Sequence, residues 1–149
     1  EERWRIAKDP TVGSFALMAG VLLILSKVAA LSGLSSYGYI VLIPMLARTA
    51  VIWAMARYPV HDSSLLGRQS NLRWDEIILP FGIGLSLSVV IAVLTQTNLM
   101  PLLIALGVST FLVAIFLKQK MQGLGGDAYG AIVEMNEAVL LVTANFLMR

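Results

Sequence analysis

Three acidic residues stand where a polar loop turns into an apolar stretch, in the segment GLGGDAYGAIVEMNEAVLLV that begins at Gly123. Seven residues separate Asp127 from Glu134 and three separate Glu134 from Glu137, so a helix would carry all three carboxylates along one stripe. Carboxylates suit the binding of a divalent cation, and inside a bundle they also pair with Lys and Arg. Asp127 could cap the helix, but Glu134 and Glu137 lie too far inside it for capping.

Another acidic residue, Asp9, lies in the segment KDPTVG near the N-terminus. Asp followed by Pro is typical of an N-cap and the first turn of a helix. If this helix and the one after Asp127 begin at the same face of a membrane, their free backbone N–H groups and the glycine-rich loop come together. Asp9 and Asp127 could then approach one another, and such a site suits a polyphosphate held with a divalent ion that carboxylates coordinate. The nearby cations are Arg3, Arg5, Lys8 and Arg57.

Four charged residues fall inside apolar stretches: Lys27, Arg48, Glu134 and Glu137. A charge at the centre of a spanning helix costs about 2.5 to 3.5 kcal/mol on insertion scales, so such residues usually face a bundle interior, a partner or a wet cavity. Arg48 and Glu137 lie at similar depths in their helices, which permits an ion pair between them. Lys27 lies nearer the opposite surface, and two alternatives stay open for it: an internal partner, or a side chain that snorkels to that surface.

The scaffold for these residues is predicted to be helical and embedded in a lipid bilayer. Of the 149 residues, 58% are hydrophobic and 13% are charged, which is typical of an integral membrane protein. A spanning helix needs roughly 20 apolar residues. We therefore expect an all-α, polytopic transmembrane bundle of about five spanning helices, forming a single domain over residues 1–149. The predicted spans are 12–34, 37–56, 77–97, 100–117 and 128–148, with a turn at 98–101.

Lys and Arg are distributed unevenly between the two sides of this bundle. Cytoplasmic loops of membrane proteins carry the excess of these residues. If the spans alternate, eight fall on the side of the N-terminus, the 57–76 linker and the glycine loop, whereas Arg149 alone falls on the other. We therefore predict a multi-pass protein of the cytoplasmic (inner) membrane, with its N-terminus and candidate site facing the cytoplasm. The eight are Arg3, Arg5, Lys8, Arg57, Arg68, Arg73, Lys118 and Lys120.

Composition excludes several classes of chemistry. The chain has no Cys, which excludes disulfides and thiolate chemistry, and its one histidine, His61, excludes a histidine-cluster metal site. A net charge of +2, without basic residues interleaved with aromatics, argues against nucleic acid as a partner. The segment EERWRIAKDP has neither an initiator Met nor the apolar region of a signal peptide, so the chain is expected to be part of a longer protein.

Three segments, in order along the chain, resemble the cobalamin synthase family, also called the adenosylcobinamide-GDP ribazoletransferases. EERWRIAKDPTVGSFALMAGVLLILSKVAAL resembles the family's E-R-x-x-x-I-M-x-D-x-x-x-G-x-x-G element and the Lys-bearing helix after it. ARTAVIWAMARYP resembles the intervening helix, and GLGGDAYGAIVEMNEAVLL resembles the G-G-x-T-G-D-x-x-G-A-x-x-E-x-x-E element. The chain departs from this pattern at Pro10, Ala16 and Gly125, where the family usually has Ser, Gly and Thr.

The resemblance implies a Mg²⁺-dependent membrane transferase that joins α-ribazole, or its 5′-phosphate, to adenosylcobinamide-GDP and releases GMP. It implies that Asp9, Asp127 and Glu134 act in catalysis and metal binding. Because the family carries an Asp-rich metal motif upstream, the chain is expected to be the C-terminal part of the enzyme, inactive without the missing N-terminal part. Residues expected to bind substrate are Arg3, Lys8, Gly13, Arg48, Arg57, Gly126, Gly130 and Glu137, with Arg48 and Glu137 also forming an internal supporting pair.

Two other interpretations of the charged residues stay open at the level of sequence. Intramembrane Lys, Arg and Glu also mark ion pathways, so the chain could be a fragment of a transporter or channel. A transporter requires polar residues along a complete route, whereas here they concentrate toward the predicted cytoplasmic half and the 100–117 span is apolar. A structural membrane subunit without chemistry would leave the three stacked carboxylates unexplained.

Overall fold

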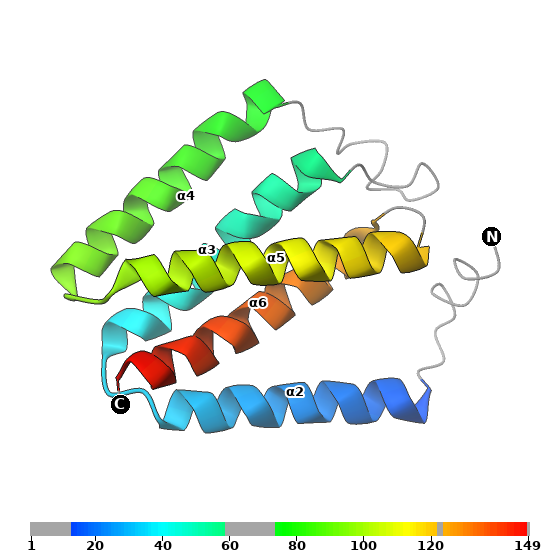
Figure 1. Cartoon of the computed structure of the whole chain (residues 1–149), viewed down its shortest axis with the longest axis horizontal. Coiled ribbons are helices and arrows are strands. Elements are labelled where there is room, and N and C mark those ends of the chain that lie inside the picture. Colours follow the sequence, from blue (N-terminus) through cyan, green and yellow to red (C-terminus); the bar gives the residue numbers. More distant parts are fainter. Residues whose placement is uncertain (1–12, 59–73, 122–123, 149) are drawn as a thin grey trace.

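The computed structural model describes residues 13–58, 74–121 and 124–148. In these ranges the chain forms the helices α2 (Ser14–Ser32), α3 (Tyr37–Arg57), α4 (Trp74–Leu94), α5 (Leu99–Met121) and α6 (Gly126–Leu147). Figure 1 shows that successive helices run in opposite directions. The first residues of α2, α4 and α6 and the last residues of α3 and α5 therefore lie toward one end, which we call the linker end. We call the opposite end, with the short turns, the hairpin end.

The five described helices are each long and apolar enough to cross a membrane, which confirms the predicted all-α polytopic bundle. Their bounds lie within four residues of the predicted spans. The largest difference occurs at the end of α5, which continues to Met121 instead of ending near residue 117. Lys118 and Lys120 occupy this last turn, where a cation interacts favourably with the negative end of the helix dipole.

The turn between α4 and α5 lies three residues earlier than the predicted turn at 98–101. Gln96 adopts a left-handed conformation with a φ of 52°. The backbone N–H of Thr97 donates to the carbonyl of Ala92 at 2.9 Å, which satisfies a terminal carbonyl of α4 as in a Schellman motif. Pro101 lies in the first turn of α5, where its missing N–H leaves no helical hydrogen bond unmade. The prediction treated this proline as part of the turn and therefore placed the turn too late.

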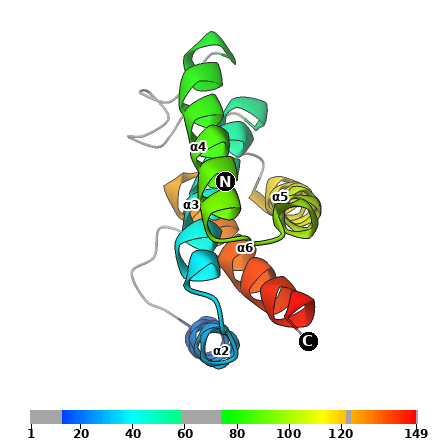
Figure 2. The same ribbon diagram turned by 90° about the vertical axis from the view of Figure 1, so that its left-hand side faces the viewer.

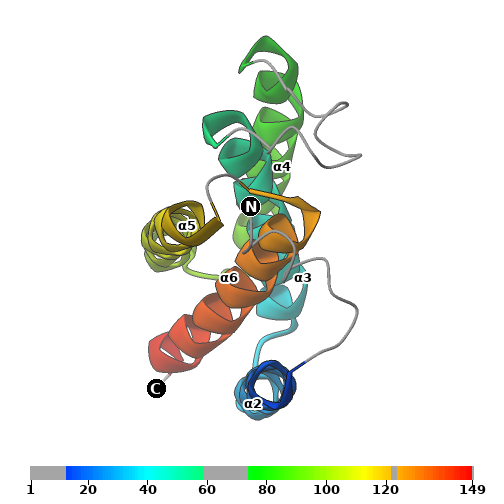
Figure 3. The ribbon, with the colours of Figure 1, turned by 90° about the vertical axis from the view of Figure 1, so that its right-hand side faces the viewer.

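Helices α3 and α6 form the centre of the bundle. Helix α3 packs against α4, α5 and α6, while α6 also packs against α2 and α5. Figures 2 and 3 show α4 and α2 on opposite sides of this centre. Close packing is the main attraction between helices in lipid, because burial from lipid brings no hydrophobic gain. The main core consists of Tyr39, Leu42, Ile43, Leu46, Ala50, Ala92, Leu102, Leu106, Leu140, Leu141 and Ala144.

Two buried hydrogen bonds fix α6 against its neighbours. Near the linker end, the Tyr129 hydroxyl donates to the backbone carbonyl of Tyr58 at 2.7 Å. In the middle of α6, Asn136 Nδ2 donates to Thr110 Oγ1 of α5 at 2.9 Å. The side chains of Tyr129 and Asn136 are both buried. These bonds set the rotation of α6 about its own axis, and thereby decide which face of α6 presents its carboxylates to α2 and α3.

Candidate functional site

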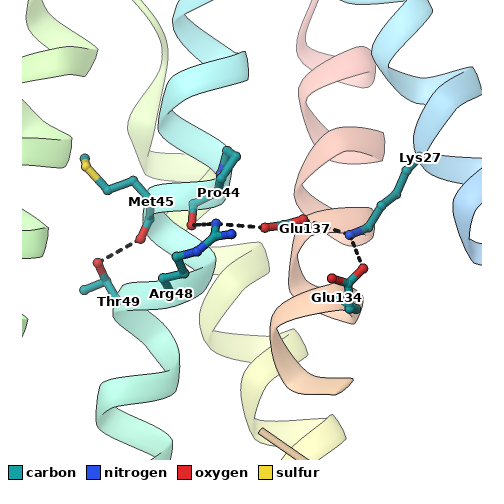
Figure 4. Close-up of polar contacts among 7 residues, drawn as sticks. All are labelled: Lys27, Pro44, Met45, Arg48, Thr49, Glu134 and Glu137. Carbon is teal, nitrogen blue, oxygen red and sulfur yellow. Dashed lines mark hydrogen bonds and ion pairs between the residues drawn. The ribbon is translucent and has the colours of Figure 1, made fainter. Parts of the chain in front are cut away.

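Four charged side chains from three helices form one ion-pair network in the middle of the bundle (Figure 4). Lys27 Nζ of α2 donates to Glu134 Oε2 at 2.6 Å and to Glu137 Oε2 at 2.8 Å, both on α6. Arg48 Nη1 of α3 donates to Glu137 Oε1 at 3.2 Å and to the carbonyl of Pro44 at 3.1 Å. Glu137 thus contacts a cation through each of its oxygens. The two positive and two negative charges of the network cancel.

The predicted ion pair between Arg48 and Glu137 is confirmed, whereas the snorkelling alternative for Lys27 is wrong. The Cα–Cβ bonds of a helix tilt toward its N-terminus, so a lysine extends back along its own helix. Helices α2 and α6 run in the same direction (Figure 1). The Lys27 ammonium therefore reaches back toward the linker end, to the depth of Glu134 and Glu137, rather than outward to the nearer surface.

The network has a shielded part and an exposed part. The side chains of Lys27 and Glu137 are 15% and 16% exposed, whereas those of Glu134 and Arg48 are 54% and 67% exposed. An ion pair that is shielded from water is weakened less by solvent and salt. The contact between Lys27 and Glu137 is therefore the strongest ion pair of the network, and the pairs that involve Arg48 and Glu134 are weaker.

The exposed part continues along α6 to the linker end. Asp127, Gly130 and Glu134 are all exposed and follow one stripe of the helix. We call these three residues, together with Arg48, the open face. A Cβ at Gly130, one of the residues expected to bind substrate, would meet no atom within 4 Å among the described residues. Its small size leaves space open beside the carboxylates.

Helix α2 touches the rest of the bundle along a narrow seam. Residues 14–22 are all exposed, whereas Leu23, Lys27 and Ala30 are partly buried at helical spacing. Toward the hairpin end, Asn145 Nδ2 of α6 donates to the carbonyl of Ala30 at 2.7 Å. The first half of α2 therefore stands clear of the other described helices, at the end where α6 exposes its carboxylates.

The structure separates Arg57 from Arg48, although both lie on α3. Nine residues correspond to about two and a half helical turns, so the two side chains leave opposite sides of the helix. The Arg57 guanidinium lies 5.4 Å from the centroid of the Tyr58 ring, and Lys118 Nζ of α5 lies 5.7 Å from the same centroid. Arg57 therefore belongs to a basic group at the linker end rather than to the network.

The remaining predicted site residues are near the linker end or outside the described ranges. Gly13 is the N-cap of α2 and Gly126 is the first residue of α6, so both backbones lie at helix N-termini. Arg3, Lys8 and Asp9 lie outside the described residues, and their roles stay predictions.

The carboxylates in the described ranges do not by themselves provide a magnesium site. No group of three His, Cys, Asp or Glu side chains that could hold a metal ion occurs among the described residues. Both oxygens of Glu137 and one oxygen of Glu134 already contact cations. The Cα atoms of Asp127 and Glu134 are about 10.5 Å apart along the helix axis. Mg²⁺ holds its ligands at about 2.0–2.1 Å, so the two side chains are too widely spaced to form a site by themselves. A metal at Asp127 therefore needs further ligands, and Asp9 is the predicted one.

Lys27 is the residue of the network to which the sequence assigned no site role. The signal that could have found it was its position inside the first span, combined with the backward direction of a lysine side chain on a helix. Tyr129 and Asn145 also fix the arrangement around α6. Their roles could not be predicted from the sequence, because a polar residue in an apolar span does not show which backbone carbonyl will accept its hydrogen bond.

The chain matches the family model described as cobalamin-5-phosphate synthase over residues 1–145. It is 31% identical over 144 residues to the adenosylcobinamide-GDP ribazoletransferase of Thermosynechococcus vestitus, covering 95% of this chain and 58% of that protein. For the proteins of the same name from Pseudomonas paraeruginosa and Prosthecochloris aestuarii, the identities are 32% and 30%. These two alignments cover 95% and 99% of this chain, and 58% and 62% of the relatives. The chain thus spans about three fifths of their length. No solved structure matches the chain significantly.

Proposed function

The chain belongs to the cobalamin-5-phosphate synthase family, and on this premise we propose that it acts in a membrane transferase. The proposed reaction joins α-ribazole, or its 5′-phosphate, to adenosylcobinamide-GDP and releases GMP. The observation that carries the proposal is the family match over residues 1–145, which includes every residue of the network and the open face. The three relatives are each named adenosylcobinamide-GDP ribazoletransferase, which is the name of this activity.

The proposed chemistry is a displacement at phosphorus. A ribose hydroxyl of α-ribazole other than the 5′-hydroxyl, and therefore free in its 5′-phosphate as well, attacks the phosphorus that carries the cobinamide ester. The bond from that phosphorus to the bridging oxygen of GDP breaks. GMP leaves with the bonding electrons, and the hydroxyl proton passes to a base. Negative charge increases on the transferred group and on the leaving group, so the site needs fixed cations and a carboxylate that positions the attacking hydroxyl.

Residues of the open face supply groups of these kinds. Asp127 is exposed in the first turn of α6, where free backbone N–H groups favour negative charge. We assign Asp127 and Glu134 to positioning of substrate or metal, Lys8 and Arg57 to the phosphates, and Arg48 and Glu137 to an internal supporting pair. Lys27 neutralises Glu137 and holds Glu134 in place through its short contacts.

Mg²⁺ remains part of this proposal, with Asp127 and Asp9 as its ligands. When bound, the ion would neutralise charge on the diphosphate, which is its common role in phosphoryl transfer. Glu134 Oε2 contacts Lys27, so Oε1, which has no partner among the described residues, is the oxygen that could contribute. Binding of Mn²⁺ to the full-length enzyme, followed by electron paramagnetic resonance, should weaken when Asp127 is replaced by Asn. Unchanged binding would remove Asp127 from the metal site.

We propose that the linker end faces the cytoplasm. Arg57, Lys118 and Lys120 lie at this end, whereas the described residues of the hairpin turns contain no Lys or Arg. This asymmetry supports a cytoplasmic linker end under the positive-inside rule. Soluble nucleotide substrates would then reach the open face from the cytoplasm.

The described charges argue against the transporter alternative. Beyond the network toward the hairpin end, the exposed residues of α6 are Val142, Phe146 and Leu147. A transport route needs polar groups along its whole length. In the described helices the charged groups extend from the linker end only as far as the middle of the bundle, which suits a site entered from one side.

The proposal is tested by replacing Asp127 with Asn in the full-length enzyme in detergent. GMP release from adenosylcobinamide-GDP and α-ribazole should be abolished, because Asn keeps the shape of the side chain and removes its charge. Asp75→Asn is the matched control, since Asp75 is also exposed in the first turn of a helix at the linker end. Release near the wild-type rate by the Asp127 variant would exclude Asp127 from the site. Absence of GMP release by the wild-type enzyme would overturn the proposed function itself.

A further inference from the structure

In its contacts with the described residues, Arg48 uses one of the three nitrogens of its guanidinium group. Nη1 donates to Glu137 and to the carbonyl of Pro44, whereas Nε and Nη2 have no partner within the described ranges. The two acceptors hold the plane of the group in place. The unused edge is therefore a positioned pair of N–H donors, and such a pair matches two oxygens of a phosphate in a bidentate contact.

The depth of Arg48 makes an unused donor edge costly. Arg48 lies nine residues before the end of α3, which corresponds to about 14 Å from the linker end. Its side chain is 67% exposed at this depth. A charged group at the centre of a bilayer is among the most expensive groups to leave in hydrocarbon, so water, an anionic ligand or a polar group of a further protein segment must reach it.

The open face provides a route to Arg48 from the linker end. Asp127, Gly130 and Glu134 are exposed along α6, and the missing side chain of Gly130 leaves space beside them. Residues 14–22 of α2 stand clear of the other described helices at the same end. In the described helices the charged residues stop at the network, where Arg48 presents two N–H donors without a partner to an anion that enters along this face.

We propose that Arg48 binds the diphosphate of the nucleotide-activated substrate through Nε and Nη2, and that Glu137 acts as the positioning residue for Arg48. This inference rests on the proposed function and names the substrate that the site recognises. Glu137 also contacts Lys27 at 2.8 Å, so its charge is shared between two cations and does not fully neutralise Arg48. Without its 5′-phosphate, the second substrate α-ribazole is an uncharged nucleoside and offers Arg48 no oxyanion, so this form is used in the test.

The test is a comparison of the two substrates with the full-length enzyme in detergent. Arg48→Gln should raise the KM for adenosylcobinamide-GDP by about tenfold or more, because a hydrogen bond to a charged group is lost, while the KM for α-ribazole changes by less than about twofold. Arg48→Lys keeps the charge but loses the paired donors, so it should raise the same KM by a smaller factor. Lys120→Gln, which removes an exposed cation at the end of α5, is the control for overall charge and should leave both KM values unchanged.

The outcomes separate this inference from the proposed function. If the wild-type enzyme releases GMP but Arg48→Gln raises both KM values equally, or lowers only kcat, Arg48 does not recognise the diphosphate. If Arg48→Gln cannot be purified as a folded protein, Arg48→Lys decides, since an effect confined to adenosylcobinamide-GDP supports the inference and an equal effect on both substrates overturns it. A wild-type enzyme without GMP release overturns the proposed function, and this inference with it.

Discussion

Replacing Glu137 with Gln removes the negative charge that both cations of the network contact. The structure predicts how much of the lost stability comes from the contact with Lys27 and how much from the contact with Arg48. Lys27 contacts Glu137 at 2.8 Å, and both side chains are mostly shielded, at 15% and 16% exposure. Arg48 contacts Glu137 at 3.2 Å and is 67% exposed. Hydrogen bonds to charged groups contribute about 1.5–3 kcal/mol, whereas exposed ion pairs contribute about 0–1 kcal/mol. We therefore expect Glu137→Gln to lower the free energy of unfolding by about 2–3 kcal/mol, mainly through Lys27.

Double-mutant cycles measure the two shares separately. The cycle of Lys27→Met with Glu137→Gln should give a coupling energy of about 1.5–3 kcal/mol. The value should lie toward the lower limit, because Glu134 still contacts Lys27 after Glu137 is changed. The cycle of Arg48→Met with Glu137→Gln should give less than about 1 kcal/mol, because water screens the exposed guanidinium.

The assay is unfolding in mixed micelles by increasing SDS, followed by circular dichroism. Lys120→Gln combined with Glu137→Gln serves as the control cycle, since Lys120 lies at the far end of α5 and should show no coupling. A coupling energy for Arg48 equal to or larger than that for Lys27 would refute the reasoning. It would mean that water does not screen the pair between Arg48 and Glu137, although the guanidinium is exposed.

Two further predictions concern the packing that positions the network. Tyr129→Phe should lower the free energy of unfolding by about 1–2 kcal/mol, because the buried carbonyl of Tyr58 loses its hydrogen-bond donor. The control is Tyr37→Phe, which should change the free energy of unfolding by less than about 0.5 kcal/mol, because the Tyr37 side chain is 86% exposed. Gly38→Ala should cost about 1–3 kcal/mol in the same assay, because the new Cβ would collide with the turn between α4 and α5. Gly82→Ala should instead stabilise the protein by about 0.5–1 kcal/mol, since nothing lies within 4 Å of its Cβ position and Ala favours a helix. Equal effects within either pair would contradict this packing.

The sequence predicted the helices well because the bilayer restricts the possible structures. A spanning segment must satisfy its backbone hydrogen bonds internally and needs about 20 apolar residues, so apolar length alone identifies the helices. The ends were less predictable. At the end of α4, the backbone bond from Thr97 to Ala92 and the left-handed Gln96 decide where the helix stops. Hydropathy does not detect such local bonds.

The sequence predicted part of the candidate site for a similar reason. Arg48 and Glu137 lie at matching depths on helices that turn out to be neighbours, so counting residues was sufficient to pair them. Lys27 was left without an assigned partner, because depth counted at its Cα ignores the reach and direction of its side chain. The space at Gly130 was also not predictable, since a small residue permits close packing without requiring it.

The sequence by itself determined the number of helices, their alternating directions, the family and the stripe that carries Asp127, Glu134 and Glu137. These properties follow from apolar length, motif spacing and the periodicity of a single helix. Only the tertiary structure decided that this stripe meets Lys27 on one side and Arg48 on the other, and that its outer part stays open. The physical reason is that periodicity fixes the faces of a helix relative to its own axis. Which neighbour each face meets depends on the rotation of α6, and that rotation is set by distant contacts such as the bond from Tyr129 to Tyr58.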